Sequence, residues 1–181
     1  KGLVQAFDVR TGERRWTFRT VPGPGEVGHE TWENDSWGVN GNNGVWTQIS
    51  VDAELGIVYL PVETPTGDYY GGHRPGDNLF GESLVAVSLE TGERLWHFQF
   101  VHHPIWDYDV PSQPSLIELE TDAGLVPALV QPTKMGHLFV LDRRTGEPLF
   151  PVEERPVPQT DVPGEYTSAT QPFPTHSPPL H

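Results

Sequence analysis

The sequence has 181 residues, which is enough for one domain of ordinary size but a tight fit for two. Its 25 aspartates and glutamates against 11 lysines and arginines give a net charge of −14, which would repel a phosphate backbone, so nucleic acid is not an expected partner. The sequence contains no cysteine, which excludes disulfides and thiolate metal sites, and no apolar run approaches the roughly 20 residues that a membrane helix requires.

Short β-branched or aromatic runs predict strands along almost the whole chain, and no segment shows a convincing helical period. In chain order these runs are WTQISV (46–51), GIVYLPV (56–62), SLVAVSL (83–89), LWHFQF (95–100), PALVQP (127–132) and HLFVL (137–141). The 19 glycines and 19 prolines are dispersed between hydrophobic runs, which predicts tight turns and long loops. Residues 151–181 are proline-rich and poor in strand pattern, so we expect a segment that wraps around the fold or is partly mobile.

An internal repeat indicates the fold class. The segments AFDVRTGERRWTF (6–18), AVSLETGERLWHF (86–98) and FVLDRRTGEPLF (139–150) share an apolar strand, a Thr-Gly pair and a closing aromatic residue. We interpret each as a hairpin whose turn glycine adopts a positive φ and whose last aromatic residue, such as Trp16 or Trp96, docks under the next unit. Three unrelated hairpins are the alternative. Recurring four-stranded units of this kind are typical of an all-β fold, the β-propeller.

The repeats divide the chain into propeller blades. We assign residues 1–20 to the end of one blade, 46–100 to a full blade, 113–150 to most of the next blade and 151–181 to a proline-rich connecting tail. Propellers close with about four to eight blades, so this chain is expected to be an incomplete segment. Its blade faces would need the remaining blades, or further copies of the chain, as partners.

The stretch FVHHPIWDYDVPSQP (100–114) places two histidines, two aspartates and buried-type aromatic residues in one connection. Neither a solvated loop nor a core strand needs this combination, so it indicates binding or catalysis. Asp107 and Asp109 would point to the same side of an extended segment, and two converging carboxylates suit a hard cation. Asp107 could instead cap the amides of a turn, and Asp109 could lie behind the site or at the surface. For His102 and His103, contact with a substrate and hydrogen bonding within the loop are both open.

Five segments in register resemble one known family. They are GLVQAFDVRTGERRW, GIVYLPVETPTGDYYGG, VHHPIWDYDVPSQP, TKMGHLFVLDRRTGEPL and RPVPQ…YTSATQPF, and together they run over nearly all of the chain. They are similar to signatures of the pyrroloquinoline quinone (PQQ) dependent dehydrogenases, closest to the membrane-bound glucose and quinate type. The eight-bladed propeller of that family is several times as long, so the resemblance implies an internal segment.

The resemblance also implies an activity, cofactors and a location. Family members oxidise a sugar or an alcohol by proton abstraction and hydride transfer to the quinone, and they pass the electrons to a membrane quinone or a cytochrome. Calcium, or another divalent or lanthanide ion, lies beside the quinone. The implied location is periplasmic.

Individual residues match the family's functional positions. Asp107 matches the catalytic carboxylate that takes the alcohol proton. Lys134 matches the cation that contacts the quinone oxygens, although a solvated strand-edge lysine is the alternative. Trp46 matches the tryptophan that lies flat under the PQQ ring, against the alternative of blade packing. Thr64 stands where methanol dehydrogenases have a metal-binding asparagine, as in the glucose-type branch, and Asp109 matches a metal ligand of lanthanide-using relatives.

Two alternatives to a working enzyme segment are open. A non-catalytic propeller scaffold, such as an outer-membrane assembly protein, would keep the Thr-Gly-Trp hairpins but would have no need for Trp46, Asp107 and Lys134 together. An inactive fragment would retain these residues and lack the quinone contacts and the metal ligand that the family carries on other blades.

Overall fold

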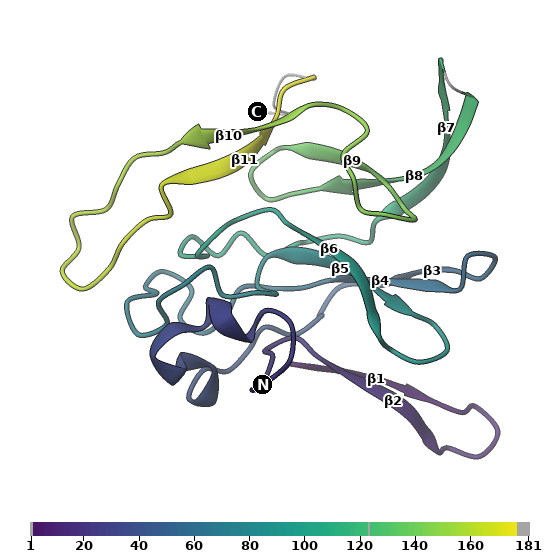
Figure 1. The fold of residues 1–181 in the computed structure, drawn as a ribbon, viewed down its shortest axis with the longest axis horizontal. Coiled ribbons are helices and arrows are strands. Elements are labelled where there is room, and N and C mark those ends of the chain that lie inside the picture. The colour runs from purple at the N-terminus through teal and green to yellow at the C-terminus, as the bar shows by residue number, and fades with distance from the viewer. Residues whose placement is uncertain (1, 123, 177–181) are drawn as a thin grey trace.

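The computed structural model describes residues 2–122 and 124–176, and these residues form strands and two short 3-10 helices (Figure 1). The strands are β1 (Leu3–Phe7), β2 (Arg14–Arg19), β3 (Ser50–Asp52), β4 (Ile57–Pro61), β5 (Ser83–Ser88), β6 (Arg94–Gln99), β7 (Ser115–Thr121), β8 (Gly124–Pro132), β9 (Leu138–Asp142), β10 (Val152–Pro156) and β11 (Thr170–Pro174). The helices η1 (His29–Thr31) and η2 (Glu33–Gly38) lie between β2 and β3. Within the described ranges, no helix has the length and apolar character needed to cross a membrane.

The strands form antiparallel sheets that stack on one another (Figure 1). Strands β3 to β6 make a four-stranded sheet in sequence order, and β7 to β9 make a three-stranded sheet. The β1–β2 hairpin lies on the far side of the four-stranded sheet from β7–β9. An isolated antiparallel bridge between Leu141 and Pro148 lies at the position of a fourth strand beside the three-stranded sheet. Pro148 has no N–H to donate to β9. The prediction of an all-β propeller segment is confirmed.

The four-stranded sheet is buried on both faces because it lies between two neighbours. On β4, Ile57 and Tyr59 pack into a cluster with residues of β8 and β9, whereas Val58 and Leu60 pack toward the β1–β2 hairpin. Strand β5 repeats this alternation. Successive side chains of a strand point to opposite faces, so a continuous apolar run such as IVYL belongs to a sheet covered on both sides.

The Thr-Gly turns have the same geometry in all three repeats. The φ of the turn glycine is 74° at Gly12, 73° at Gly92 and 78° at Gly146. The tryptophan of one repeat packs on the turn glycine of the next, since a Cβ atom would lie 2.6 Å from the Trp16 ring if added to Gly92 and 2.4 Å from the Trp96 ring if added to Gly146. The predicted docking of the repeat tryptophans is therefore confirmed.

The tail contains a hairpin that its sequence pattern did not predict. Strand β10 pairs with β11, and Pro172 and Pro174 lie inside β11. Proline cannot donate to a neighbouring strand, but each strand of a two-stranded ribbon has one free edge, which tolerates proline. Residues 157–169, between β10 and β11, project to the left in Figure 1, and we call them the strap.

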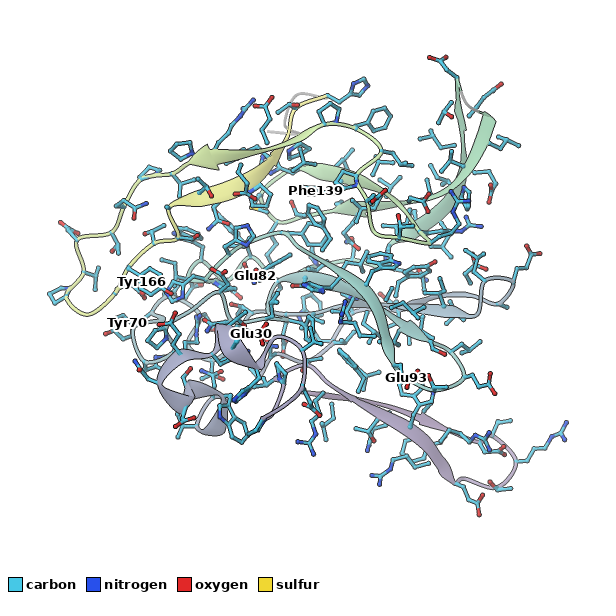
Figure 2. The ribbon with its side chains drawn as sticks, viewed as in Figure 1. Glu30, Tyr70, Glu82, Glu93, Phe139 and Tyr166 are labelled. Atoms are coloured by element: carbon cyan, nitrogen blue, oxygen red, sulfur yellow. The ribbon has the colours of Figure 1, made fainter. Side chains whose placement is uncertain are left out.

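The two ends of the sheets differ in character. Because consecutive strands run antiparallel, the connections that follow β2, β4, β6 and β8 emerge at one end, which we call the loop end. The Thr-Gly turns lie at the opposite end. Figure 2 marks the two ends by its labels, with Tyr70 and Tyr166 at the loop end and Glu93 at the turn end.

This topology gathers the residues that the sequence singled out. Each of them follows an even-numbered strand, and they are Trp46 after β2, Thr64 after β4, Asp107 and Asp109 after β6, and Lys134 after β8. All five positions therefore belong to the loop end.

Candidate active site

Two aspartates and a lysine meet at the loop end. The Lys134 Nζ donates to Asp109 Oδ2 and to the backbone carbonyl of Asp107, at 3.0 Å in both cases, and lies 3.5 Å from Asp107 Oδ2. Asp107 has a φ of 54°, a conformation that is unfavourable for L-residues and that surrounding contacts must hold. The lysine thus ties the β8–β9 turn to the loop that carries both carboxylates.

Thr64 and Trp46 lie on the connections beside this cluster. The backbone N–H of Thr64 donates to Asp109 Oδ1 at 2.8 Å, while the Thr64 residue is only 2% exposed. The connection that carries Trp46 runs alongside, because the N–H of Gly44 donates to the Glu63 carboxylate at 2.7 Å. Trp46 is 56% exposed, so its indole ring is open to solvent.

Acidic groups dominate the electrostatics of the cluster. Burial, followed by the charge of Asp109, raises the pKa of Asp107 against the opposing effect of Lys134. Burial also raises the pKa of Glu63, and nearby aspartates add to this effect although the Gly44 N–H opposes it. Partial burial alone would lower the pKa of Lys134, but its contacts with Asp109 and Asp107 outweigh burial and raise it. The ammonium therefore stays charged in a negative surrounding that attracts cations.

Glu82 is a buried acid behind the cluster that sequence reasoning missed. Its side chain is fully buried (Figure 2), and no donor in the described ranges reaches either carboxyl oxygen with hydrogen-bond geometry. Burial raises the pKa of Glu82 to about 8, although the nearby Tyr108 N–H and Thr64 hydroxyl favour the charged form. In the stretch FGESLVAVS, Glu82 resembles an ordinary polar residue before a strand, so the sequence carries no signal for it.

The residues of the cluster fit part of a metal and quinone site. Carboxylate oxygens are the ligands that calcium and other hard cations prefer, and the charges of Asp107 and Asp109 are close enough to influence each other. In the part of the chain that the structure describes, no group of three or more His, Asp or Glu side chains is arranged to hold a metal ion. Lys134 offers a positive charge and Trp46 an open aromatic face to a planar, anionic quinone.

A cavity of about 720 Å³ opens between the Asp107 loop and the strap. Trp106 and Tyr108, the neighbours of Asp107 in sequence, line it from the loop, and Thr160 and Val162 line it from the strap. Small-molecule sites commonly have volumes of about 300–1,000 Å³ and mostly apolar walls. The cavity is therefore a candidate space for a substrate beside Asp107.

The two histidines of the loop contact protein groups. His102 contacts the Gln99 side chain through Nδ1 at 2.9 Å and the Glu154 carboxylate through Nε2 at 3.1 Å. His103 is fully buried and contacts the Glu165 carboxylate of the strap at 2.9 Å. Sequence reasoning did not identify Glu165, because its partner lies 62 residues away in the chain.

The fold and the cluster define a β-propeller segment with a lysine-bridged pair of carboxylates at the loop end of its blades. The family model described as "PQQ: Glucose/ethanol/alcohol dehydrogenase, beta-propeller domain" matches residues 1–181. The chain therefore belongs to the β-propeller family of PQQ-dependent glucose, ethanol and alcohol dehydrogenases, and the resemblance inferred from the motifs is confirmed.

Individual relatives agree with this assignment. The chain is 45% identical over 175 residues to the quinoprotein glucose dehydrogenase of Gluconobacter oxydans (strain 621H). The aligned region covers 95% of this chain and 21% of that protein. A solved quinohemoprotein alcohol dehydrogenase, ADHIIG from Pseudomonas putida HK5, is similar with a TM-score of 0.77 and 30% identity over 96% of this chain and 27% of that one. A europium-containing methanol dehydrogenase has a TM-score of 0.73 and 26% identity over 96% and 33% of the two chains. The chain spans about a fifth of the length of the glucose dehydrogenase.

Proposed function

We propose that this chain is a segment of a PQQ-dependent dehydrogenase that oxidises a sugar or an alcohol. The observation that carries the proposal is the convergence of Asp107, Asp109 and Lys134 at the loop end, where both carboxylates lie within 3.5 Å of one ammonium group. Membership of a dehydrogenase family supports it.

Each residue of the cluster has a proposed task. Asp107, whose side chain is 34% exposed, takes the proton of the substrate hydroxyl. Lys134 contacts the quinone oxygens with its charged ammonium, and Trp46 provides the aromatic floor of the cofactor site. PQQ, when bound, supplies the acceptor for the hydride. Thr64 assists the cofactor site by orienting Asp109 through its backbone N–H.

A cation beside the quinone is part of the proposal, with Asp109 as one ligand. Calcium, another divalent ion or a lanthanide would suit the carboxylate oxygens of this chain. The europium in the name of one structural relative supports a metal site in this fold. The remaining ligands would come from outside this chain.

The proposed partners follow from the family and from the blade faces. We propose a membrane quinone or a cytochrome as electron acceptor and a periplasmic location. The quinohemoprotein among the relatives supports the cytochrome option. Leu3 and Phe7 of β1 are 54% and 57% exposed, which supports contact with the remaining blades or with further copies of the chain.

An inactive fragment is the second candidate, because the described residues do not complete a metal site by themselves. A pure scaffold is less well supported, since it would not need a lysine that bridges two carboxylates at the loop end. These candidates differ in whether the segment binds the quinone.

The test is a titration of the 181-residue chain, and of the longer dehydrogenase, with PQQ and calcium. We expect calcium-dependent quenching of tryptophan fluorescence that is lost in the double variant Asp107→Asn/Lys134→Met. The control Glu93→Gln, at the turn end, should bind as the unmodified protein does. In the longer protein, Asp107→Asn alone should lower kcat by about 10²–10⁴-fold and spare quinone binding.

The outcomes separate the candidates. Binding by the longer protein alone means that other blades complete the site. Absence of PQQ binding by both proteins would contradict the proposed function, and undiminished turnover by Asp107→Asn would contradict its role as base.

A further inference from the structure

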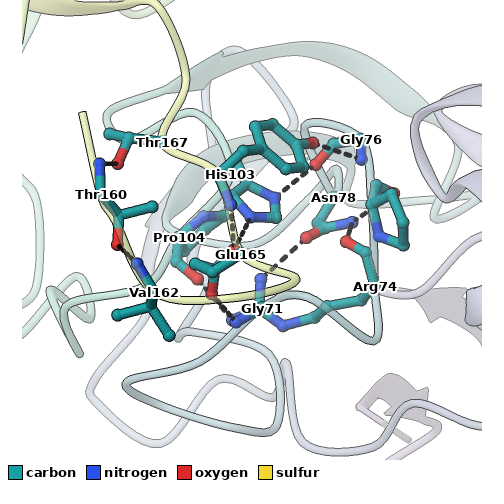
Figure 3. Close-up of polar contacts among 12 residues, drawn as sticks. Gly71, Arg74, Gly76, Asn78, His103, Pro104, Thr160, Val162, Glu165 and Thr167 are labelled. Carbon is teal, nitrogen blue, oxygen red and sulfur yellow. Dashed lines mark hydrogen bonds and ion pairs between the residues drawn. The ribbon is translucent and has the colours of Figure 1, made fainter.

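The strap is anchored to the Asp107 loop through a buried contact between a histidine and a glutamate (Figure 3). The His103 Nε2 lies 2.9 Å from Glu165 Oε1, and the two side chains are 0% and 3% exposed. The His103 Nδ1 lies 2.9 Å from the carbonyl oxygen of Gly76. Both ring nitrogens thus face acceptors, and only the doubly protonated ring makes both hydrogen bonds at once.

The His103 ring is also held by contacts on one face and at one edge. Tyr166 of the strap stacks on it with ring centroids 4.0 Å apart and an interplanar angle of 17°. The Tyr166 hydroxyl accepts a hydrogen bond of 2.6 Å from the N–H of Gly76, which fixes the stacking ring in turn. At Gly71, a Cβ atom would lie 2.9 Å from His103 Nε2, so the absence of a side chain lets the backbone approach the ring.

Glu165 is held as a carboxylate. Burial alone would raise the pKa of Glu165, but hydrogen bonds from His103 and from the N–H groups of Gly71 and Tyr166 outweigh burial and lower it. A buried charge that loses its hydrogen-bond partner is costly, so the Glu165 carboxylate and the His103 ring hold each other in position.

Arg74 fixes the next residue of the same loop. Its side chain is fully buried, and its guanidinium donates to the backbone carbonyl of Pro104. The same guanidinium donates to the Gly67 carbonyl at 2.9 Å and to Asn78 Oδ1 at 2.8 Å. The loop is therefore gripped at His103 and Pro104 before it reaches Asp107.

The backbone conformation links this grip to the site. His103 and Asp107 have φ values of 47° and 54°, left-handed conformations that are less favourable for L-residues than right-handed ones, although histidine and aspartate adopt them more readily than most. The strap contacts the side chain of the first residue, and Lys134 donates a hydrogen bond to the backbone carbonyl of the second. Between the two anchors lie only three residues, so a shift of His103 would be transmitted to the Asp107 carboxylate.

We propose that Glu165 is a positioning residue for Asp107, and that the strap acts as a brace which holds the catalytic loop through His103. This rests on the proposed function, in which Asp107 is the base. Misplacement of a reacting group by about 1 Å can cost 10²-fold in rate, so loss of the brace should lower turnover without removing any group that touches the cofactor.

The test compares two glutamates of the tail that each pair with a neighbouring histidine. Glu165→Gln removes the buried charge, whereas Glu154→Gln removes a carboxylate that pairs with His102 and whose side chain is 51% exposed. In the longer dehydrogenase, we expect Glu165→Gln to lower kcat by about 10–100-fold, with PQQ affinity and KM within about twofold of the unmodified protein. Hydrogen–deuterium exchange of the 100–110 peptide should accelerate in Glu165→Gln and stay unchanged in Glu154→Gln.

A second variant and the exchange measurement distinguish failure of the brace from a failure to fold and from a failure of the proposed function. If Glu165→Gln fails to fold, Tyr166→Phe, which removes only the bond to Gly76, should show a smaller acceleration of the same exchange. Unchanged exchange and unchanged kcat in the folded variants would overturn the brace. Absence of PQQ-dependent turnover in the unmodified protein would overturn the proposed function, and the exchange measurement would then decide alone whether the strap holds the loop.

Discussion

Glu82 is an acid placed where its ionisation is costly. Its folded pKa of about 8 lies above its ordinary value of 4.5, because burial disfavours the carboxylate. The folded protein therefore binds this proton more tightly than the unfolded chain does. The stability that protonation of Glu82 contributes is fully present below about pH 4.5 and is lost as the pH rises to about 8.

We predict that Glu82→Gln, which is neutral at every pH, unfolds at a higher temperature than the unmodified chain at pH 8. The difference in the free energy of unfolding between the variant and the unmodified chain should shrink toward pH 4.5, by up to about 1.4 kcal/mol per pH unit. Thermal unfolding followed by circular dichroism across this range measures it, with the turn-end variant Glu93→Gln as the control. A constant difference at every pH would contradict the buried, proton-binding state of Glu82.

The residues proposed to contact the cofactor or the substrate were the easier ones to find in the sequence. Asp107, Lys134 and Trp46 lie within motifs whose residue types serve one chemistry, so a family resemblance transfers to them position by position. Glu82 and Glu165 act through burial and through partners far away in the chain, and the sequence does not show either property.

At the scale of elements, the hairpin repeat is the unit that joins one blade to the next. Each turn glycine has a positive φ, and the glycine of a following repeat receives the tryptophan of the preceding one. Gly12 has the same conformation as Gly92, but space for a Cβ atom is open there, with no other atom of the described chain within 4 Å. Substitution of Gly12 therefore measures the cost of the backbone conformation alone, whereas substitution of Gly92 adds the cost of losing the contact with the Trp16 ring.

We predict that Gly12→Ala destabilises the chain by roughly 1–2 kcal/mol, the cost of a left-handed conformation in an L-residue. Gly92→Ala should cost about 1–3 kcal/mol more, because its methyl group would overlap the Trp16 ring. Urea denaturation of the two variants measures the difference. Equal destabilisation by both substitutions would contradict a packed contact between Trp16 and the Gly92 turn.

At the scale of the whole molecule, the stacked sheets leave one face of the β1–β2 hairpin uncovered. Val4 packs inward against the four-stranded sheet, whereas Leu3 and Phe7 point to the other side and are more than half exposed. Exposed apolar faces of this kind favour association. A neighbouring blade in a longer chain, or a second copy of this one, would bury them.

We predict that the isolated chain self-associates in a concentration-dependent manner through this face. The double variant Leu3→Ser/Phe7→Ser should weaken the association, whereas Val9→Ser, at the 97% exposed hairpin tip, should leave it unchanged. Sedimentation velocity over a concentration series measures both. A monomer at all concentrations would show that the hairpin face does not drive assembly.

The sequence by itself determined the all-β class, the blade repeat and the docking tryptophans, because alternating or continuous apolar runs, turn glycines and closing aromatics are local signals with direct structural meaning. It also singled out Asp107 and Lys134. Only the tertiary structure decided that Lys134 bridges both aspartates, that Glu82 is buried behind them and that the proline-rich tail returns as a hairpin whose strap grips His103. These features depend on contacts between distant segments, and burial and pairing at that distance follow from the stacking of the blades.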